Sequence, residues 1–198
     1  MNYIFEISLN NLIDLSKDKY GSRVIESIID TYKAAQINMN SIIKKISDNF
    51  YNIIDNESGR YVIKYILLNC QTDKNINEIY QKLIENDNVV NYSKNKNLVY
   101  VINVALLKGD IEKSKLIINK IVKENNMETI LDLGNHKYGN FVVQTIIDII
   151  GQYNKDIEKN IISTIKKAPD GKYMQYVKKH ILEKSCKKFE REEISKTI

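Results

Sequence analysis

A short motif recurs along this chain at an almost constant interval. Its clearest copies read Lys-Tyr-Gly, then a polar residue, a large residue and two apolar residues; the five copies are residues 19–26, 57–64, 96–103, 137–144 and 178–183. With the residue after the glycine position as an anchor, the anchors are Ser22, Arg60, Val99, Asn140 and Lys179. Successive anchors are 38, 39, 41 and 39 residues apart. A steady period near 40 residues is typical of helical-repeat solenoids, so this interval predicts a stack of similar units.

Apolar residues follow the first four anchors at helical spacing. A pair of apolar residues recurs one turn later, and the resulting quartets are Val24/Ile25/Ile28/Ile29, Val62/Ile63/Ile66/Leu67, Val101/Ile102/Ala105/Leu106 and Val142/Val143/Ile146/Ile147. This spacing produces one wide apolar helix face, which predicts that the quartets form the core. Apolar residues at helical spacing also precede each copy, as at Leu9, Leu12 and Ile13. We therefore expect an all-α, curved, right-handed α-solenoid of about five helix pairs, each of roughly 39 residues.

This pattern places residues 1–198 in a single domain. The expected units are approximately 1–35, 36–73, 74–110 and 111–152, followed by a cap at 153–198. Gly21, Gly59 and Gly139 directly precede the second helix of their units, where glycine suits a tight turn. Leu98 replaces the glycine in the third unit, which predicts a looser turn there.

Composition narrows the class of protein. Apolar residues make up 43% of the chain, enough for a packed core, and the net charge of +5 is compatible with an RNA partner. Cys70 and Cys186 have no metal-binding spacing and favour a reduced, intracellular protein. The chain starts without a signal peptide and contains no run of 18 apolar residues, so we expect no membrane partner. We expect a cytoplasmic monomer, with the nucleus or nucleolus as the alternative location.

The anchors also define a row of candidate binding slots. An anchor and the residue four positions later share one helix face, and these pairs are Ser22/Glu26, Arg60/Lys64, Val99/Asn103, Asn140/Gln144 and Lys179/Glu183. The residue after each anchor is planar or aromatic: Arg23, Tyr61, Tyr100, Phe141 and His180. Polar groups beside a planar group, repeated at a fixed pitch, can hold one flat base per unit, the arrangement by which some helical repeats read RNA.

The units resemble Pumilio (PUF) RNA-binding repeats. Residues 138–144 are close to the family consensus for a repeat that reads uracil, which implies that Asn140 and Gln144 bind the base edge and that Phe141 stacks. Ser22 and Glu26 match the guanine-reading pair of the family. The resemblance extends over nearly the whole chain, which is similar to the C-terminal half of a PUF array, with four repeats and a cap.

The resemblance implies roles for the remaining slot residues as well. Asn103 is expected at a base edge, and the stacking residues are expected to be Arg23, Tyr61, Tyr100, Phe141 and His180. Val99 offers no hydrogen bond, so its slot departs from the family pattern. Arg60 and Lys64 offer only donors, which suits phosphate or a carbonyl-rich base edge. Together with Lys179 they are expected to contact the phosphate backbone. If RNA runs antiparallel to the repeats, as in the family, the expected pattern is 5′-U-n-n-G-3′.

Other functions find less support in the sequence. His136 and His180 have no Cys or Asp at ligand spacing, so we expect no metal site, and no nucleotide-binding or hydrolase motif occurs. We therefore expect neither an enzyme nor a cofactor. Basic residues crowd the last unit, either as an ordinary capping face or as a phosphate-contacting end: Lys166, Lys167, Lys172, Lys178, Lys179, Lys184, Lys187, Lys188 and Arg191.

Two hypotheses remain. The first is a module that binds single-stranded RNA on its concave face and acts in post-transcriptional control or RNA processing. The second is a decayed, PUF-derived scaffold that binds a protein, ribosomal or other ribonucleoprotein partner without reading bases.

Overall fold

The chain folds into stacked helices, as the sequence predicts. The computed structural model describes residues 2–122 and 127–194, with side chains described for 6–122 and 127–186, and these ranges contain helices and turns but no β-strand. The helices are α1 (Asn2–Asn10), α2 (Leu12–Lys17), α3 (Gly21–Ala34), α4 (Asn40–Asp48), α5 (Phe50–Ile54), α6 (Gly59–Asn69), α7 (Ile76–Ile84), the 3₁₀ helix η1 (Glu85–Asp87), α8 (Asn88–Lys94), α9 (Val99–Lys108), α10 (Ile111–Val122), α11 (Glu128–Gly134), α12 (Gly139–Ile150), α13 (Lys155–Lys167) and α14 (Met174–Ile194). The expected all-α solenoid class is confirmed.

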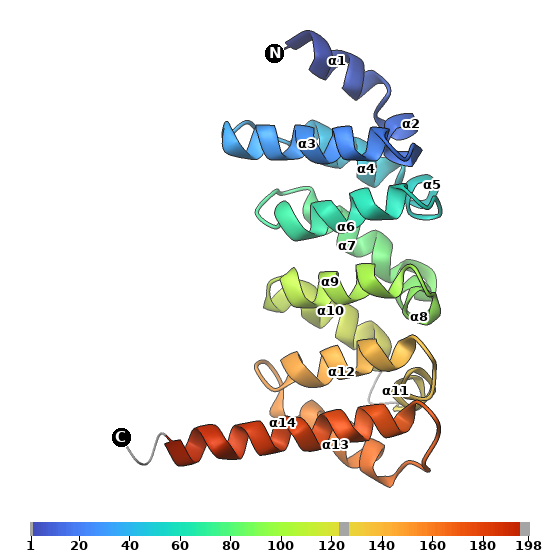
Figure 1. Ribbon diagram of the computed structural model, residues 1–198, viewed down its shortest axis with the longest axis vertical. Coiled ribbons are helices and arrows are strands. Elements are labelled where there is room, and N and C mark those ends of the chain that lie inside the picture. The colour runs from blue at the N-terminus through green and yellow to red at the C-terminus, as the bar shows by residue number, and fades with distance from the viewer. Residues whose placement is uncertain (1, 123–126, 195–198) are drawn as a thin grey trace.

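The helices form an elongated stack (Figure 1). The helices α3, α6, α9, α12 and α14 lie one above another along one side, and each packs against the next. Behind them, α4 packs against α7 and α7 against α10. We call the surface formed by α3, α6, α9, α12 and α14 the ladder face. It carries the recurring motif, so its geometry decides what the motif can do.

In the described ranges each of the first four units contains three α-helices, and the third unit also contains η1, so each unit has a short helix that the pattern of helix pairs did not predict. A short helix stands between the two long ones, and these short helices are α2, α5, α8 and α11. The break is small in the second unit, where α4 ends at Asp48 and α5 begins at Phe50. Phe50, Ile53 and Ile54 are all buried, so the short helix turns the chain while still contributing to the core.

The apolar quartets form the core of the second, third and fourth units. Each of their members is at most 2% exposed. The first unit differs, because Ile25 and Ile29 are fully buried but Val24 is 44% exposed and Ile28 is half-buried. The prediction that Val24 belongs to the core was therefore wrong. Val62, which holds the equivalent position in the second unit, is fully buried.

The three motif glycines are required by a close approach between backbones. None of the glycines has a positive φ, so conformational freedom is not the reason for them. A Cβ atom on Gly59 would lie 2.0 Å from the carbonyl oxygen of Ile53, and one on Gly21 would lie 2.6 Å from that of Leu15. The short helix ends directly against the start of the ladder helix, which leaves no room for a side chain. At Leu98 the ladder helix begins one residue later, at Val99, consistent with a looser turn.

A side-chain acceptor orients the start of the ladder helix in each of the first four units. It stands three residues before the glycine position and accepts hydrogen bonds from two backbone N–H groups; the four acceptors are Asp18, Asn56, Asn95 and His136. The backbone N–H groups of Gly21 and, second, Tyr20 stabilise the Asp18 carboxylate and hold its pKa below its usual value. These turn contacts fix the direction in which the anchor and the following side chain leave the helix.

The close approach of Gly21 to the backbone of Leu15 predicts the effect of a substitution on stability. Gly21→Ala should lower the free energy of unfolding by a net ~1 kcal/mol, because the cost of overpacking exceeds the better helix propensity of alanine. Urea denaturation followed by circular dichroism measures this. Leu98→Gly, at the equivalent position of the third unit, is the matched comparison. It should also lower the free energy of unfolding, but because it removes a buried side chain that is only 6% exposed. A Gly21→Ala protein more stable than the parent would contradict the close approach.

Candidate functional site

One large planar side chain on each ladder helix projects from the ladder face. The four residues predicted to stack in the first four units, Arg23, Tyr61, Tyr100 and Phe141, are all exposed. Exposed aromatic rings are costly to leave in water and are normally buried, so a regular row of them indicates a binding surface. The sequence-based choice of these four positions agrees with their placement on the surface.

The fifth unit lies in a different register from the one expected. Helix α14 begins at Met174, and the Lys172-Tyr173 pair before it repeats the Lys137-Tyr138 pair before α12. The lysine ammonium lies 5.5 Å from the tyrosine ring centre in the fifth unit and 5.3 Å in the fourth. This alignment makes Gln175, not Lys179, the fifth anchor, one helical turn earlier than expected.

Burial supports the corrected register. Val177 and Ile181 on α14 are buried, as Val142 and Ile146 are on α12. Tyr176 then occupies the position of Phe141, and it is 56% exposed against 51% for Phe141. The loop before α14 shortens the last interval, and the many polar residues of α14 obscure its apolar stripe, so the sequence pattern favours the wrong register.

His180 has another partner in this register. Its Nε2 atom lies 2.7 Å from Oδ1 of Asp148 on the neighbouring ladder helix. Tyr65 makes the equivalent contact between α6 and α3, where its hydroxyl donates to Asp30 at 2.5 Å. That bond and burial raise the pKa of Tyr65 to about 12. Both contacts clamp neighbouring ladder helices together.

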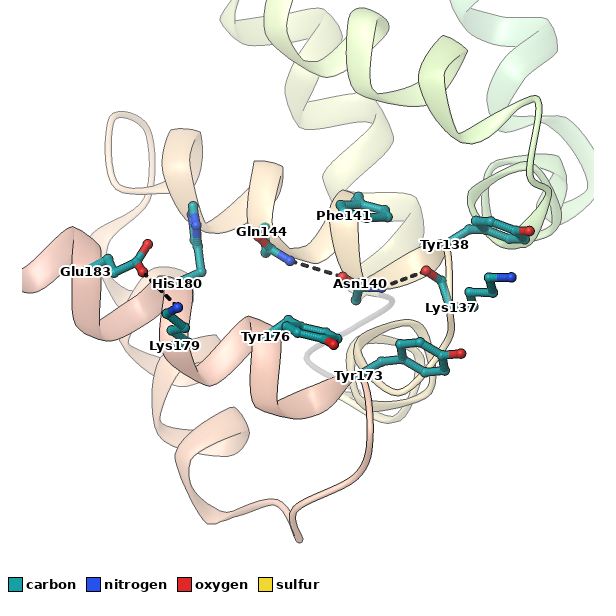
Figure 2. A pocket seen from close by; sticks show the side chains of 10 residues that line it. All are labelled: Lys137, Tyr138, Asn140, Phe141, Gln144, Tyr173, Tyr176, Lys179, His180 and Glu183. Atoms are coloured by element: carbon teal, nitrogen blue, oxygen red, sulfur yellow. Dashed lines mark hydrogen bonds and ion pairs between the residues drawn. The ribbon is translucent and has the colours of Figure 1, made fainter.

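The best-formed slot lies between α12 and α14 (Figure 2). It is a pocket of about 550 Å³ whose lining includes Asn140, Phe141, Gln144, Tyr176 and Lys179. In the view of Figure 2, Asn140 and Gln144 lie between the rings of Phe141 and Tyr176. The pocket therefore has two aromatic walls and a polar floor, which suits a flat ligand with a polar edge.

Hydrogen bonds orient the floor of this slot. The Nδ2 group of Asn140 donates to the backbone carbonyls of His136 and Lys137 at 2.9 and 2.8 Å. Its Oδ1 accepts from Nε2 of Gln144 at 3.0 Å. Both Nδ2 hydrogens are thus used by the backbone. The groups left to the slot are the second lone pair of Asn140 Oδ1, the remaining Nε2 hydrogen of Gln144 and the Oε1 acceptor of Gln144.

The first unit shows the same local geometry at Ser22. The Ser22 hydroxyl donates to the carbonyl of Lys19 at 3.1 Å, as Asn140 does to Lys137. Ser22, Arg23 and Tyr61 line a pocket of about 800 Å³ between α3 and α6. Glu26 is not part of that lining; its Oε2 accepts a bond from Arg23 at 2.7 Å, which raises the pKa of Arg23. The structure therefore holds the acidic member of this pair against its own stacking residue.

The two middle units differ from the outer ones. Arg60, Tyr61, Lys64 and Tyr100 line a small pocket of about 100 Å³ between α6 and α9. In the third unit Val99 is buried, and Oδ1 of Asn103 is a buried acceptor without a hydrogen-bond partner in the described part of the chain.

Acidic neighbours surround the basic residues of the last unit. Lys179 lies 3.8 Å from Glu183, Lys178 donates to Asp170 at 2.6 Å, and Lys184 donates to Glu158 at 2.9 Å. Lys187, Lys188 and Arg191 lie outside the residues whose side chains are described. In the described ranges, no group of three or more His, Cys, Asp or Glu could hold a metal ion, and no helix is long and apolar enough to cross a membrane.

The stacked units and their ladder of slots define a helical-repeat protein with a ligand-binding face. The model of the family described as "Pumilio-family RNA binding repeat" matches residues 11–39 and 130–152, which contain the first and fourth copies of the motif. These two segments, together with the relatives and solved structures below, support a divergent Pumilio (PUF) repeat protein.

The chain is also similar to individual curated proteins. It is 25% identical over 159 residues to Pumilio domain-containing protein 5 of Caenorhabditis elegans, a match that covers 71% of this chain and 28% of the relative. It is 26% identical over 145 residues to Suppressor protein MPT5 of Saccharomyces cerevisiae, covering 70% and 16%. The chain thus spans less than a third of either curated relative.

Solved structures show the same fold. The Puf3 RNA binding domain bound to site A of the Cox17 RNA 3′ UTR recognition sequence has a TM-score of 0.70 and 25% identity, covering 83% of this chain and 50% of that one. The Puf4 RNA binding domain bound to the HO endonuclease RNA 3′ UTR recognition sequence has a TM-score of 0.76 and 20% identity, covering 93% and 55%.

Proposed function

We propose that this protein binds single-stranded RNA along the ladder face, with one base in each slot, and acts in post-transcriptional control or RNA processing. The observation that carries this proposal is the pocket between Phe141 and Tyr176, with an oriented amide pair as its floor. The RNA-bound state of the Puf3 and Puf4 domains supports it.

Uracil fits the floor of that pocket. The free lone pair of Asn140 can accept from the N3–H group of uracil, while the remaining hydrogen of Gln144 Nε2 donates to an adjacent carbonyl. Stacking on Phe141 and Tyr176 adds roughly 1–3 kcal/mol per base. Cytosine lacks the N3 hydrogen, so it leaves the Asn140 acceptor unpaired.

Guanine is the proposed ligand of the first slot. The Glu26 carboxylate can accept from the N1–H and N2–H groups of guanine, a pair of donors that uracil does not offer. To do so it must exchange its bond from Arg23, whose planar guanidinium then stays available for stacking. With RNA antiparallel to the repeats, the proposed site reads 5′-U-n-n-G-3′. Four bases do not define a transcript, so we expect further contacts or a protein partner to complete recognition.

Fluorescence anisotropy with short labelled RNAs tests this function. An eight-nucleotide RNA containing U-n-n-G should bind, and its affinity should fall with log salt at roughly −0.7 per phosphate contact. The same RNA annealed to its complement is the control, and it should not bind because paired bases cannot enter the slots. Absence of binding to every single strand at low salt would refute the proposal and favour the non-reading scaffold.

A further inference from the structure

The slot between Tyr61 and Tyr100 has an unusual floor. Arg60 and Lys64 occupy the positions that Asn140 and Gln144 occupy in the fourth unit. The Arg60 side chain is only 14% exposed, and both residues line the pocket between the two tyrosine rings. These cations therefore stand where a base edge would lie, rather than on the outer surface.

Neither cation is strongly neutralised. Arg60 faces Glu57 at 3.5 Å, but the Glu57 side chain is 85% exposed, so water and salt screen this pair. Within the described ranges no ion pair is recorded for Lys64, and no carboxylate lines the pocket. The only other polar side chain in the lining, apart from the tyrosine hydroxyls, is the Asn97 amide. The floor consequently presents hydrogen-bond donors and positive charge.

We propose that this slot selects a base with two adjacent acceptors, guanine through O6 and N7 or cytosine through N3 and O2, and discriminates against adenine and uracil. The inference rests on the proposed function. It specifies the third base of the proposed site, one of the two written as n, and gives 5′-U-n-(G/C)-G-3′. Arg and Lys commonly contact the O6 and N7 acceptors of guanine. Adenine places an amino group beside each of N1 and N7, and uracil places N3–H between its two carbonyls, so neither offers two neighbouring acceptors.

A phosphate contact by the same two residues makes a different prediction. It would strengthen binding to every sequence equally, because phosphate contacts carry no sequence information. A base-edge contact strengthens binding only when the right base occupies the slot. The two roles are therefore separated by comparing bases at one position, before and after the charge is removed.

The experiment uses four RNAs that differ only at X in 5′-U-A-X-G-3′, held in constant flanks, and measures affinity by anisotropy. We expect G or C at X to bind about tenfold more tightly than A and U. A fifth RNA carries 7-deazaguanine at X, which lacks the N7 acceptor. If Arg60 and Lys64 contact O6 and N7 of guanine, this RNA should bind more weakly than the RNA with G at X. Equal affinity for the four bases, or a preference for A or U, would overturn the inference.

Variants complete the test. Lys64→Gln, at a half-buried site with no recorded ion pair in the described ranges, should reduce the preference for G or C while changing binding to A and U little. Arg60→Gln combined with it should abolish the preference. Lys159→Gln is the control: it removes the same charge from an exposed site on α13 and should leave the order of the four bases unchanged.

A uniform loss of affinity for all four RNAs in Lys64→Gln would show a phosphate contact instead. Failure of every RNA to bind the parent protein would overturn the proposed function and this inference together.

Discussion

Replacing Asn140 by Ser and Gln144 by Glu together should convert the slot between α12 and α14 from a preference for uracil to one for guanine. Ser22 already makes the backbone contact that Asn140 makes, a bond to the carbonyl three residues earlier, so the Ser side chain is accommodated locally. The new carboxylate at 144 would accept from the two donors of guanine and would repel the carbonyl oxygens of uracil. Each preference is worth ~1–3 kcal/mol if base-edge energies from DNA carry over.

The measurement is a binding series with U, G, A and C at the first position of the site, for the parent and the double variant. The reciprocal change, Ser22→Asn with Glu26→Gln, is the matched control, and it should move the preference at the last position from guanine to uracil. An unchanged order of the four bases in both variants would refute the assignment of these pairs to base edges.

Tyr176→Ala should weaken RNA binding by roughly 1–3 kcal/mol, because one aromatic wall of the uracil slot is lost. The salt slope should stay the same, since stacking releases no counterions. Tyr176→Phe keeps the ring and should bind like the parent. Phe141→Ala should have a similar effect, and the two alanine changes combined should cost less than their sum if both rings stack on one base.

His180→Ala separates the corrected register from the expected one. This change removes the contact with Asp148, so it should lower stability slightly while leaving the aromatic walls in place. Thermal melting and the same binding series measure the two effects. If His180→Ala weakened binding as much as Tyr176→Ala, then His180 would be a stacking residue and the register predicted from the sequence would be right.

The regular features of this protein were predictable from local sequence. The quartet that includes Ile63 and Ile66 has helical periodicity, and each quartet is apolar enough to be recognised without knowledge of its neighbours. The exposed planar residues were predictable for the same reason, because Tyr61, Tyr100 and Phe141 stand at a fixed distance from those quartets.

The fifth unit failed to follow this rule. In the described part of α14 the buried apolar residues are Met174, Val177 and Ile181. Lys178 and Leu182 occupy the positions of buried residues in the inner units. No later described unit packs against these two positions, so apolar side chains are not required there. The periodic signal therefore weakens where the stack ends, and the alignment slipped by one helical turn.

The period, the helix class and the polar and planar residues of the first four units were thus determined by the sequence itself, because they depend on residues close together along the chain. Tertiary structure alone decided which residues meet across neighbouring units: Phe141 with Tyr176, His180 with Asp148, and Arg60 and Lys64 with the ring of Tyr100. It also decided that Glu26 is held by Arg23 and that the motif glycines relieve backbone contacts. The physical reason is that side-chain rotamers and the packing of one helix end against the next depend on the three-dimensional arrangement, which local periodicity does not encode.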